Sequence, residues 1–435
     1  MEKIKELLRK YVINNEIFSR FVRIFSVDVL VRGANFFLIF VFLYLMTKEE
    51  FGIYGYLYSF AMTLSGILGF GFYISITKLY ADTINDRKRQ GSAIFTTTTS
   101  MLFLLAISLI VIYFTKIDVA FFSMLNNTSQ INANSYLNYR LYVFIALVSM
   151  VFTTYLTFFF VGAEQIRKLQ VFNLTRFFFA NGSAILVLYF FDGNAAILRL
   201  AFTYIAELIL TIIFGIFIFK SSFAKFDFFF LKKDFKIGLP IMVGTLISSV
   251  VGFGDKFFVM KFSGVDSFAV YNLGVMLSTI VLIVYQSFNF VWLPLFLKEK
   301  DLIVLRRKTN RYVALIFLSL SLLSIIICIG VVIGLKIELI PDKYSGVLSY
   351  LPLLLLGQVF AALVGLLVNF MTYFEKTYIQ ILVGAFVSLV GYFLYDFLVG
   401  NYFAIGASIA LLLLNILSFL IYYFRIQYYI NNRLK

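Results

Sequence analysis

The stretch "FFLIFVFLYLMTKEEFGIYGYLYSFAMTLSGILGFGFYISITKLYAD", residues 36–82, decides the fold class of this chain. Two long apolar runs flank one short charged turn at residues 47–50. A helix that crosses a bilayer needs roughly 17–25 predominantly apolar residues, and each run, the first of which begins before residue 36, is of that length. The stretch therefore predicts two membrane helices joined by a tight polar turn.

The same pattern continues along the whole chain of 435 residues, of which 62% are hydrophobic, with a mean hydropathy of +0.95. A soluble domain is typically about 45–50% apolar. The sequence thus indicates an all-α integral membrane protein. We predict twelve spans, at residues 24–45, 52–77, 92–115, 141–162, 170–191, 195–219, 237–260, 268–297, 312–335, 348–372, 377–399 and 402–424.

The net charge of +15 comes from cations that cluster between the apolar runs. This placement indicates membrane orientation and contact with anionic lipid, and argues against nucleic acid as a partner. Most cations lie on the side that carries both termini, which predicts that both termini are cytoplasmic. The chain has one cysteine and no histidine, so a disulfide within the chain and histidine ligands or bases are excluded. No phosphate-binding Gly-rich loop of the Walker A type is present.

Two halves are predicted from an internal repeat. "TKEEFGIYGYL" follows the first span, "GVDSFAVYNLG" follows the seventh, and Phe51 and Tyr54 align with Phe268 and Tyr271 under one shift. The last span of each half also follows a Gly-Asn pair. We expect parallel six-helix repeats, as in several transporter folds. The predicted parts are a basic, interfacial N-terminal segment (1–23), an N-terminal bundle (24–219), a basic cytoplasmic linker (220–236), and a C-terminal bundle with a short tail (237–435).

At these residues the chain resembles the polysaccharide transporter family, within the multidrug/oligosaccharidyl-lipid/polysaccharide flippase superfamily, and its Wzx-type flippases in particular. Residues 36–82 resemble the family's first two helices with their acidic turn. "GDKFFVMKFSGVDSFAVYNLG", residues 254–274, resembles its seventh helix with an Asp-basic pair. The resemblance implies two six-helix bundles around a central cavity that opens to each side of the membrane in turn.

The resemblance also implies a function. Such proteins move undecaprenyl-pyrophosphate-linked oligosaccharides to the outer leaflet of the bacterial cytoplasmic (inner) membrane, for synthesis of O antigen, capsule or a related polymer. Membrane lipids, a polysaccharide polymerase and chain-length machinery are the partners that it suggests. We expect no cofactor, no metal and no catalytic residue, with coupling to H⁺ or Na⁺ left open.

Two charged residues of the first span are candidates for the site. Arg32 lies about 12 Å from the predicted cytoplasmic end of its helix, at 1.5 Å per residue, too deep to reach the headgroups easily. Asp28, four residues earlier, shares its helix face. The arginine fork suits a pyrophosphate. The alternative is a structural ion pair that locks the first span to a neighbouring helix.

Three further candidates lie in the fifth and sixth spans. Arg176 and Arg199 lie about 9 Å and 6 Å inside their helix ends, so each is either a cavity cation or an interfacial anchor. Glu207 lies about 18 Å deep, near the midplane. It is a candidate for ion or proton coupling, and the alternative is a neutral acid or a partner for a nearby arginine.

The adjacent pair Asp255 and Lys256 lies near the predicted outer end of the seventh span. Adjacent helical residues point about 100° apart, so we expect separate partners for the two side chains. Asp255 is predicted to point inward, as an outer gate, while Lys256 is either an outer anchor or a substrate contact.

Two alternative functions stay open. A cation-coupled multidrug exporter of the same superfamily would favour an acidic, aromatic pocket, whereas this interior carries charges of both signs. A membrane polysaccharide polymerase or glycosyltransferase would need a sizeable outer loop with catalytic residues. The longest outer loop expected here, residues 116–140, offers little beyond Asn, Ser and one Asp. We therefore do not expect an enzyme.

Overall fold

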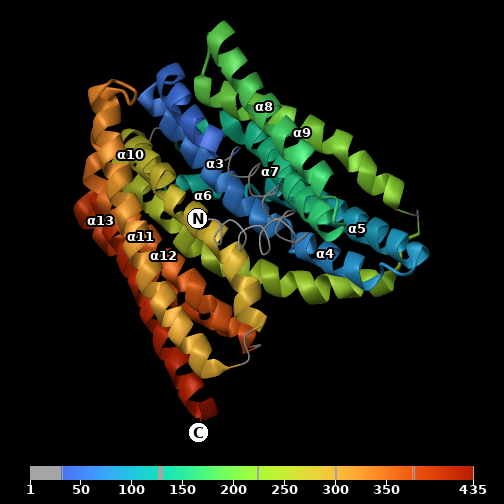
Figure 1. The fold of residues 1–435 in the computed structure, drawn as a ribbon. Coiled ribbons are helices and arrows are strands. Elements are labelled where there is room, and N and C mark those ends of the chain that lie inside the picture. The colour runs from blue at the N-terminus through green and yellow to red at the C-terminus, as the bar shows by residue number, and fades with distance from the viewer. Residues whose placement is uncertain are drawn as a thin grey trace, which may run out of the picture. The chain divides into compact units, whose positions relative to one another are not determined.

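The computed structural model describes residues 31, 33–125, 131–222, 225–298, 301–374, 376 and 378–434. Within these ranges the chain is helical and contains no strand (Figure 1). A helical segment at Gly33–Leu45 is followed by the labelled elements: α3 (Lys48–Leu68), α4 (Phe72–Asp82), α5 (Arg87–Thr115), α6 (Ile117–Ser123), α7 (Ala133–Gly162), α8 (Ile166–Phe190), α9 (Ala195–Ser221), α10 (Phe228–Lys298), α11 (Leu302–Lys336), η2 (Asp342–Tyr344), α12 (Val347–Tyr373) and α13 (Tyr378–Leu434).

Nine helices in the described part of the chain are long and apolar enough to cross a membrane. Two of them, α10 and α13, are long enough to contain two crossings each, and each has a break inside it. Gly33–Leu45 is the described part of the first predicted span. The structure thus accounts for the twelve predicted spans, and the chain is a multi-pass membrane protein. The predicted N-terminal segment, 1–23, lies outside the described residues.

The break in α10 follows the predicted repeat. Gly264, at φ 74° and ψ −179°, interrupts α10, so the second part of α10 begins at Val265. Helix α3 begins at Lys48, which the shift between Phe51 and Phe268 places opposite Val265. In both halves of the repeat, the helix that follows the turn therefore begins at the equivalent position. In α13 the break is at Phe403, at φ 54°.

Two predicted boundaries are wrong. The span 52–77 is not one helix, because Phe70 and Gly71 adopt left-handed backbone angles of φ 49° and 67° that end α3 and start α4. The predicted outer loop 116–140 contains α6, and α7 begins at Ala133 instead of residue 141. Apolar content alone does not reveal a break in a run that stays apolar through the break.

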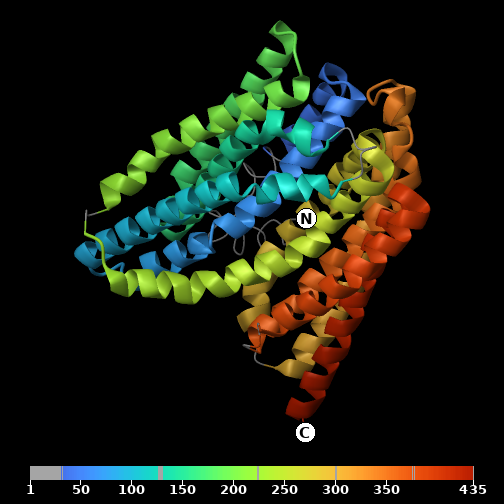
Figure 2. The same ribbon diagram turned by 180° about the vertical axis from the view of Figure 1, so that it is seen from behind.

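By contacts the chain divides into two compact units. Of the described residues, unit 1 comprises those up to 45, 68–108 and those within 144–239, and unit 2 comprises those within 46–67, 109–143 and from 240 onward. In unit 1, α8 and α9 lie side by side (Figures 1 and 2). In unit 2, α12 packs against both α11 and α13. These units cut through α5, α7 and α10, and the predicted division into bundles at 24–219 and 237–435 stays a prediction.

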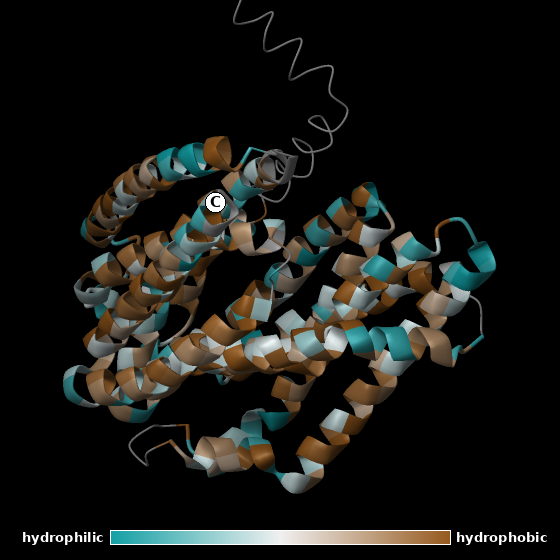
Figure 3. Cartoon of the chain, turned by 90° about the horizontal axis from the view of Figure 1, so that it is seen from below, coloured by the Kyte–Doolittle hydropathy of each residue, from teal (hydrophilic) through white to brown (hydrophobic). Residues whose placement is uncertain are grey.

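The helices carry apolar side chains on their outer faces. On α9, the side chains of Ile209, Ile212, Ile213 and Ile216 are 49–63% exposed and recur at helical spacing. Figure 3 shows hydrophobic residues along the helices and hydrophilic residues gathered at several of their ends. Exposed apolar stripes of this length are lipid-facing surfaces in a membrane protein.

Candidate functional site

Arg176 and Glu207 meet inside unit 1, one on α8 and one on α9. Arg176 lies ten residues beyond the start of α8 and Glu207 twelve beyond the start of α9, or about 15 Å and 18 Å along their axes. Both positions are near the middle of their helices. A short link at residues 191–194 joins the two helices. The two helices pack side by side, so the middle of α8 lies next to the middle of α9.

The pair has a defined geometry. Arg176 Nη1 lies 3.4 Å from Glu207 Oε1, and the side chains are 33% and 12% exposed. Thr153 of α7 donates to the same Glu207 Oε1 at 2.7 Å. The Thr153 hydroxyl also lies 3.2 Å from the Thr211 hydroxyl. Three helices therefore hold the carboxylate in place, whereas the guanidinium keeps a partly open face.

This arrangement can bind an anion by exchange. A guanidinium carries five N–H donors in a planar fork, and the described bond to Glu207 uses only the nitrogen Nη1. The guanidinium carbon also lies 5.8 Å from the centre of the Phe172 ring, which supports its orientation. The other nitrogens of the guanidinium can donate to a further acceptor while Thr153 holds Glu207. The sequence indicates both residues as candidates, with a nearby arginine as one alternative partner for Glu207, and the structure brings the two together.

Arg199 lies elsewhere in unit 1. The residue is 6% exposed, and its guanidinium carbon lies 3.5 Å from the centre of the Phe42 ring. A planar guanidinium stacks readily on an aromatic face. This contact joins α9 to the Gly33–Leu45 segment. It places the Arg199 side chain within the helix packing of unit 1, and a role in a cavity stays a prediction.

Asp255 and Lys256 bind each other in unit 2, so the expectation that the two side chains have only separate partners is wrong. Lys256 Nζ lies 3.1 Å from Asp255 Oδ1 and donates to the Gly252 carbonyl at 3.0 Å. Tyr271 donates its hydroxyl to Asp255 Oδ2 at 2.9 Å. The lysine stem has four flexible carbons, so the ammonium folds back over its own helix although the two Cβ atoms diverge. The gate and substrate roles predicted for these residues stay predictions.

The remaining candidates, Arg32 and Asp28, lie outside the described residues.

Sequence reasoning missed a buried ion pair in unit 2. Arg140 binds Asp118 through two nitrogens, Nε at 2.7 Å and Nη2 at 3.0 Å. Tyr136 donates to the same carboxylate at 3.0 Å. Arg140 Nη2 also reaches the carbonyls of Ile112 and Tyr113, each at 3.0 Å. The signal was available, since opposite charges stand at the two ends of one predicted outer loop. The pair fixes α6 between α5 and α7, which is a structural role.

A second missed residue is Asp234, in the part of α10 that belongs to unit 1. Its side chain is fully buried and accepts hydrogen bonds from Ser75 and Thr97. Nearby, the Asp227 backbone N–H donates to Thr96 at 3.0 Å, and Ser92 donates to the Lys225 carbonyl at 2.8 Å. These contacts anchor the segment predicted as a basic cytoplasmic linker onto α4 and α5. Because lysines surround Asp234 in the sequence, nothing there indicates that its carboxylate is buried.

The family follows from a comparison with known sequences. The model of the family described as polysaccharide biosynthesis protein matches residues 20–299. The chain belongs to this family. A search among curated proteins finds no sequence match.

Known structures show that this polysaccharide biosynthesis protein has the fold of the MOP superfamily, with its six-plus-six helix architecture. The structure of "lipid II flippase MurJ, inward closed conformation" matches with a TM-score of 0.67 at 15% identity, over 93% of this chain and 87% of that one. An inward-facing multidrug resistance MATE transporter matches with a TM-score of 0.65 at 14% identity, over 88% and 95%. An outward-facing one matches with a TM-score of 0.63 at 12% identity, over 97% of both chains. The predicted fold class and family resemblance are confirmed.

The described residues contain no cluster of side chains suited to bind a metal ion. Among the described residues no group of three or more His, Cys, Asp or Glu side chains gathers as a metal site requires. Coupling of transport to H⁺ or Na⁺ through the single carboxylate of Glu207 stays a prediction.

Proposed function

We propose that this protein is a flippase for undecaprenyl-pyrophosphate-linked oligosaccharide repeat units, which it moves from the cytoplasmic to the outer leaflet of the bacterial inner membrane. The family match to polysaccharide biosynthesis proteins supports this proposal, as does the fold shared with a lipid II flippase. The observation that carries it is the partly exposed Arg176 near the middle of the membrane helices. Both termini are cytoplasmic in this proposal, as the distribution of Lys and Arg predicts.

The transported molecule sets a physical problem. A pyrophosphate and its sugars must pass a hydrocarbon layer about 30 Å thick that dissolves neither. A cation fixed half-way lowers that barrier, because it replaces part of the hydration that the phosphate loses. Arginine suits the task, since its fork binds two phosphate oxygens at once. The polyprenyl tail remains in the lipid during transfer.

Glu207 gives Arg176 a partner whenever substrate is absent. An unpaired guanidinium at this depth would be costly. The carboxylate neutralises Arg176 between transport cycles, and Thr153 holds the carboxylate when phosphate takes its place. Displacement leaves the carboxylate without its cation, so the charge of the site stays compensated only if Glu207 takes up a proton during the exchange. This gives Glu207 a role in resetting the transporter, and its protonation during exchange is a route to coupling with H⁺.

A multidrug exporter is the competing function, because MATE transporters share this fold. A cationic drug needs an accessible carboxylate. Here Glu207 is 12% exposed and already paired with a cation, whereas the more exposed partner is Arg176, at 33%. The more exposed charge of the pair is therefore positive, which favours an anionic substrate.

A cellular experiment separates the two functions. A deletion strain is complemented with wild-type protein, with Arg176→Gln, or with the control Arg167→Gln, which removes an exposed arginine from the start of the same helix. We expect surface polymer to return with the wild type and the control but not with Arg176→Gln, at equal protein levels. The sequence-based candidate Arg32→Ala is expected to behave like Arg176→Gln. Unchanged polymer in the deletion strain, together with new drug sensitivity, would favour the exporter.

The product also defines what acts next. A repeat unit delivered to the outer leaflet still carries its pyrophosphate lipid. A polymerase and chain-length machinery on that side of the membrane are therefore the proposed consumers.

A further inference from the structure

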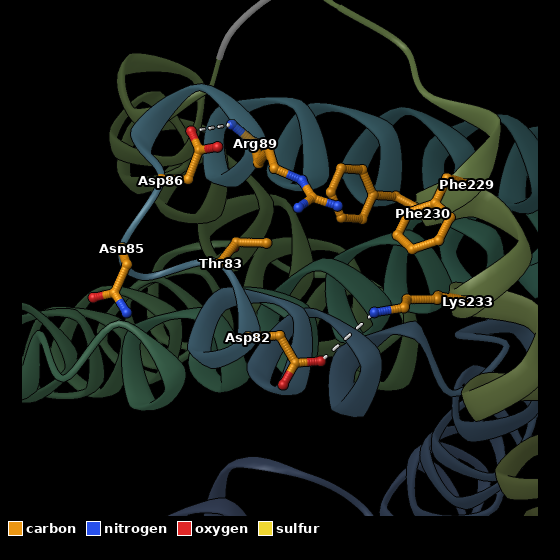
Figure 4. A pocket seen from close by; sticks show the side chains of 8 residues that line it. All are labelled: Asp82, Thr83, Asn85, Asp86, Arg89, Phe229, Phe230 and Lys233. Atoms are coloured by element: carbon orange, nitrogen blue, oxygen red, sulfur yellow. Dashed lines mark hydrogen bonds and ion pairs between the residues drawn. The ribbon is translucent and has the colours of Figure 1, made fainter.

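A groove of about 310 Å³ lies at one end of unit 1, between the α4–α5 turn and the first turns of α10. Its lining consists of Asp82, Thr83, Asn85, Asp86, Arg89, Phe229, Phe230 and Lys233 (Figure 4). Figure 4 shows side chains from the turn and from α10 lying on opposite sides of this space. The groove is distinct from Arg176 and Glu207, which lie near the middle of their helices.

Two cations of the groove converge on one aromatic ring. The Arg89 guanidinium carbon lies 6.0 Å from the centre of the Phe229 ring, and Lys233 Nζ lies 5.0 Å from the same centre. The ring thus orients both cations toward one space. Two like charges held together attract an anion, and a phosphate accepts hydrogen bonds from both types of donor.

Two carboxylates share this space. Asp82 Oδ2 lies 3.9 Å from Lys233 Nζ, the outer limit of an ion pair, and both side chains are more than 40% exposed. Asp86 accepts from the backbone N–H groups of Lys88 and Arg89 through Oδ1 alone, at 3.0 Å and 3.1 Å. Both carboxylates therefore retain acceptor capacity toward a cation. Charges of both signs, two of each, would weaken binding of a purely anionic group.

The surroundings indicate where the ligand comes from. Phe228 is 77% exposed, Phe229 50% and Phe226 42%, so apolar rings border the groove. The groove also lies on the side of the membrane where the sequence concentrates Lys and Arg, at the junction of apolar helices and charged turns. A ligand with charges of both signs attached to an apolar body fits these features.

We propose that this groove binds the headgroup of a zwitterionic phospholipid with a primary ammonium, that is, phosphatidylethanolamine. Arg89 and Lys233 bind the phosphate, and Asp82 and Asp86 accept hydrogen bonds from the ammonium. The acyl chains lie along the exposed phenylalanines. The bound lipid links the α4–α5 turn to the start of α10, which Asp234 anchors in the same unit. This site is independent of which substrate the protein transports.

The test is native mass spectrometry of the purified full-length protein in detergent, with phosphatidylethanolamine, phosphatidylcholine and phosphatidylglycerol added at equal concentrations. We expect wild-type protein to retain phosphatidylethanolamine in preference to the other two. The double variant Arg89→Gln/Lys233→Gln should retain it about tenfold less, as the loss of a charged hydrogen-bonding pair predicts. The matched control Arg87→Gln/Lys232→Gln removes equal charge from exposed neighbours in the same two elements and should retain it like wild type.

A second variant tests the choice of headgroup. Asp82→Asn/Asp86→Ser removes both carboxylates, while serine preserves a hydrogen-bond acceptor at the start of α5. The groove is then positive, and its preference should shift from phosphatidylethanolamine to phosphatidylglycerol. Equal losses in the groove and control variants would overturn the proposal. So would wild-type preference for phosphatidylglycerol, or specific displacement of phospholipid by an isoprenoid pyrophosphate, which would make the groove a docking site for transport substrate.

Discussion

Replacing Glu207 by glutamine should tighten binding of a pyrophosphate to this protein. The change removes the anion that competes for Arg176 but leaves an oxygen that still accepts a hydrogen bond from Thr153, so the packing of α7 against α9 is preserved. In the wild type, phosphate must displace the carboxylate from the guanidinium. In Glu207→Gln it binds a guanidinium without a rival.

The size of the effect follows from the geometry of the pair. Exposed ion pairs contribute about 0.2–1 kcal/mol, and breaking a buried pair costs about 3–5 kcal/mol. The Arg176–Glu207 pair lies between these cases, because its separation is 3.4 Å and its partners are 33% and 12% exposed. We take about 1–2 kcal/mol for the competition, which corresponds to roughly 5–30-fold in affinity. Turnover should fall in the same variant, because release of the product no longer has a competing anion.

Geranylgeranyl pyrophosphate is a suitable probe, since it carries the charged group on a short isoprenoid. Its dissociation constant is measured by thermophoresis for wild type, Glu207→Gln, Arg176→Gln and the control Glu164→Gln, which removes an exposed carboxylate beyond the end of α7. Binding should tighten only in Glu207→Gln and weaken about tenfold or more in Arg176→Gln. Equal affinities in wild type and Glu207→Gln, or tight binding by Arg176→Gln, would refute the exchange of anions at this pair.

Three further predictions concern the contacts that hold each unit together, and each is measured by denaturant unfolding of the purified protein in detergent. Asp118→Ala should lower the free energy of unfolding by about 3–5 kcal/mol, because it strands the charge of Arg140 at 8% exposure; the double variant Asp118→Leu/Arg140→Met should recover most of this loss, and equal instability of both variants would contradict it. Asp234→Leu should cost about 1–3 kcal/mol for each of the two hydroxyls left without an acceptor, whereas Asp234→Asn, which keeps an acceptor oxygen, should cost clearly less; equal costs would show that the negative charge, which both variants lose, matters more than the hydrogen bonds. Gly238→Ala should cost about 1–3 kcal/mol, because the new methyl group would overlap the Phe70 carbonyl oxygen; wild-type stability would mean that the α3–α4 break relaxes freely.

Most of the fold could be predicted from the sequence because a bilayer imposes a simple rule. Each crossing needs a long apolar run, and such runs are visible without tertiary information. The rule fails where the chain changes direction within an apolar run. Phe70 and Gly71 break the second span through backbone angles, and the residues around them remain apolar on both sides, so composition gave no signal.

The candidate site was predictable only in part. A charge inside an apolar span is conspicuous, and so Arg176 and Glu207 could be named. Their pairing depends on how α8 and α9 rotate about their axes, which the sequence does not specify. The prediction of separate partners for Asp255 and Lys256 was wrong because it considered only the directions of the two Cβ atoms. A flexible lysine side chain can reach a neighbour that points elsewhere. Asp234 stood among lysines, where a buried carboxylate has no distinguishing pattern.

Transport by the purified protein is the most direct test of the account. The protein is reconstituted into proteoliposomes with a defined undecaprenyl-pyrophosphate oligosaccharide, and the fraction of glycan that becomes accessible to an added glycosidase on the opposite face is followed over time. The account predicts transfer by wild type and by Arg167→Gln, and transfer near the protein-free rate by Arg176→Gln. Transfer by Arg176→Gln at the wild-type rate, or none by correctly folded wild-type protein, would contradict it.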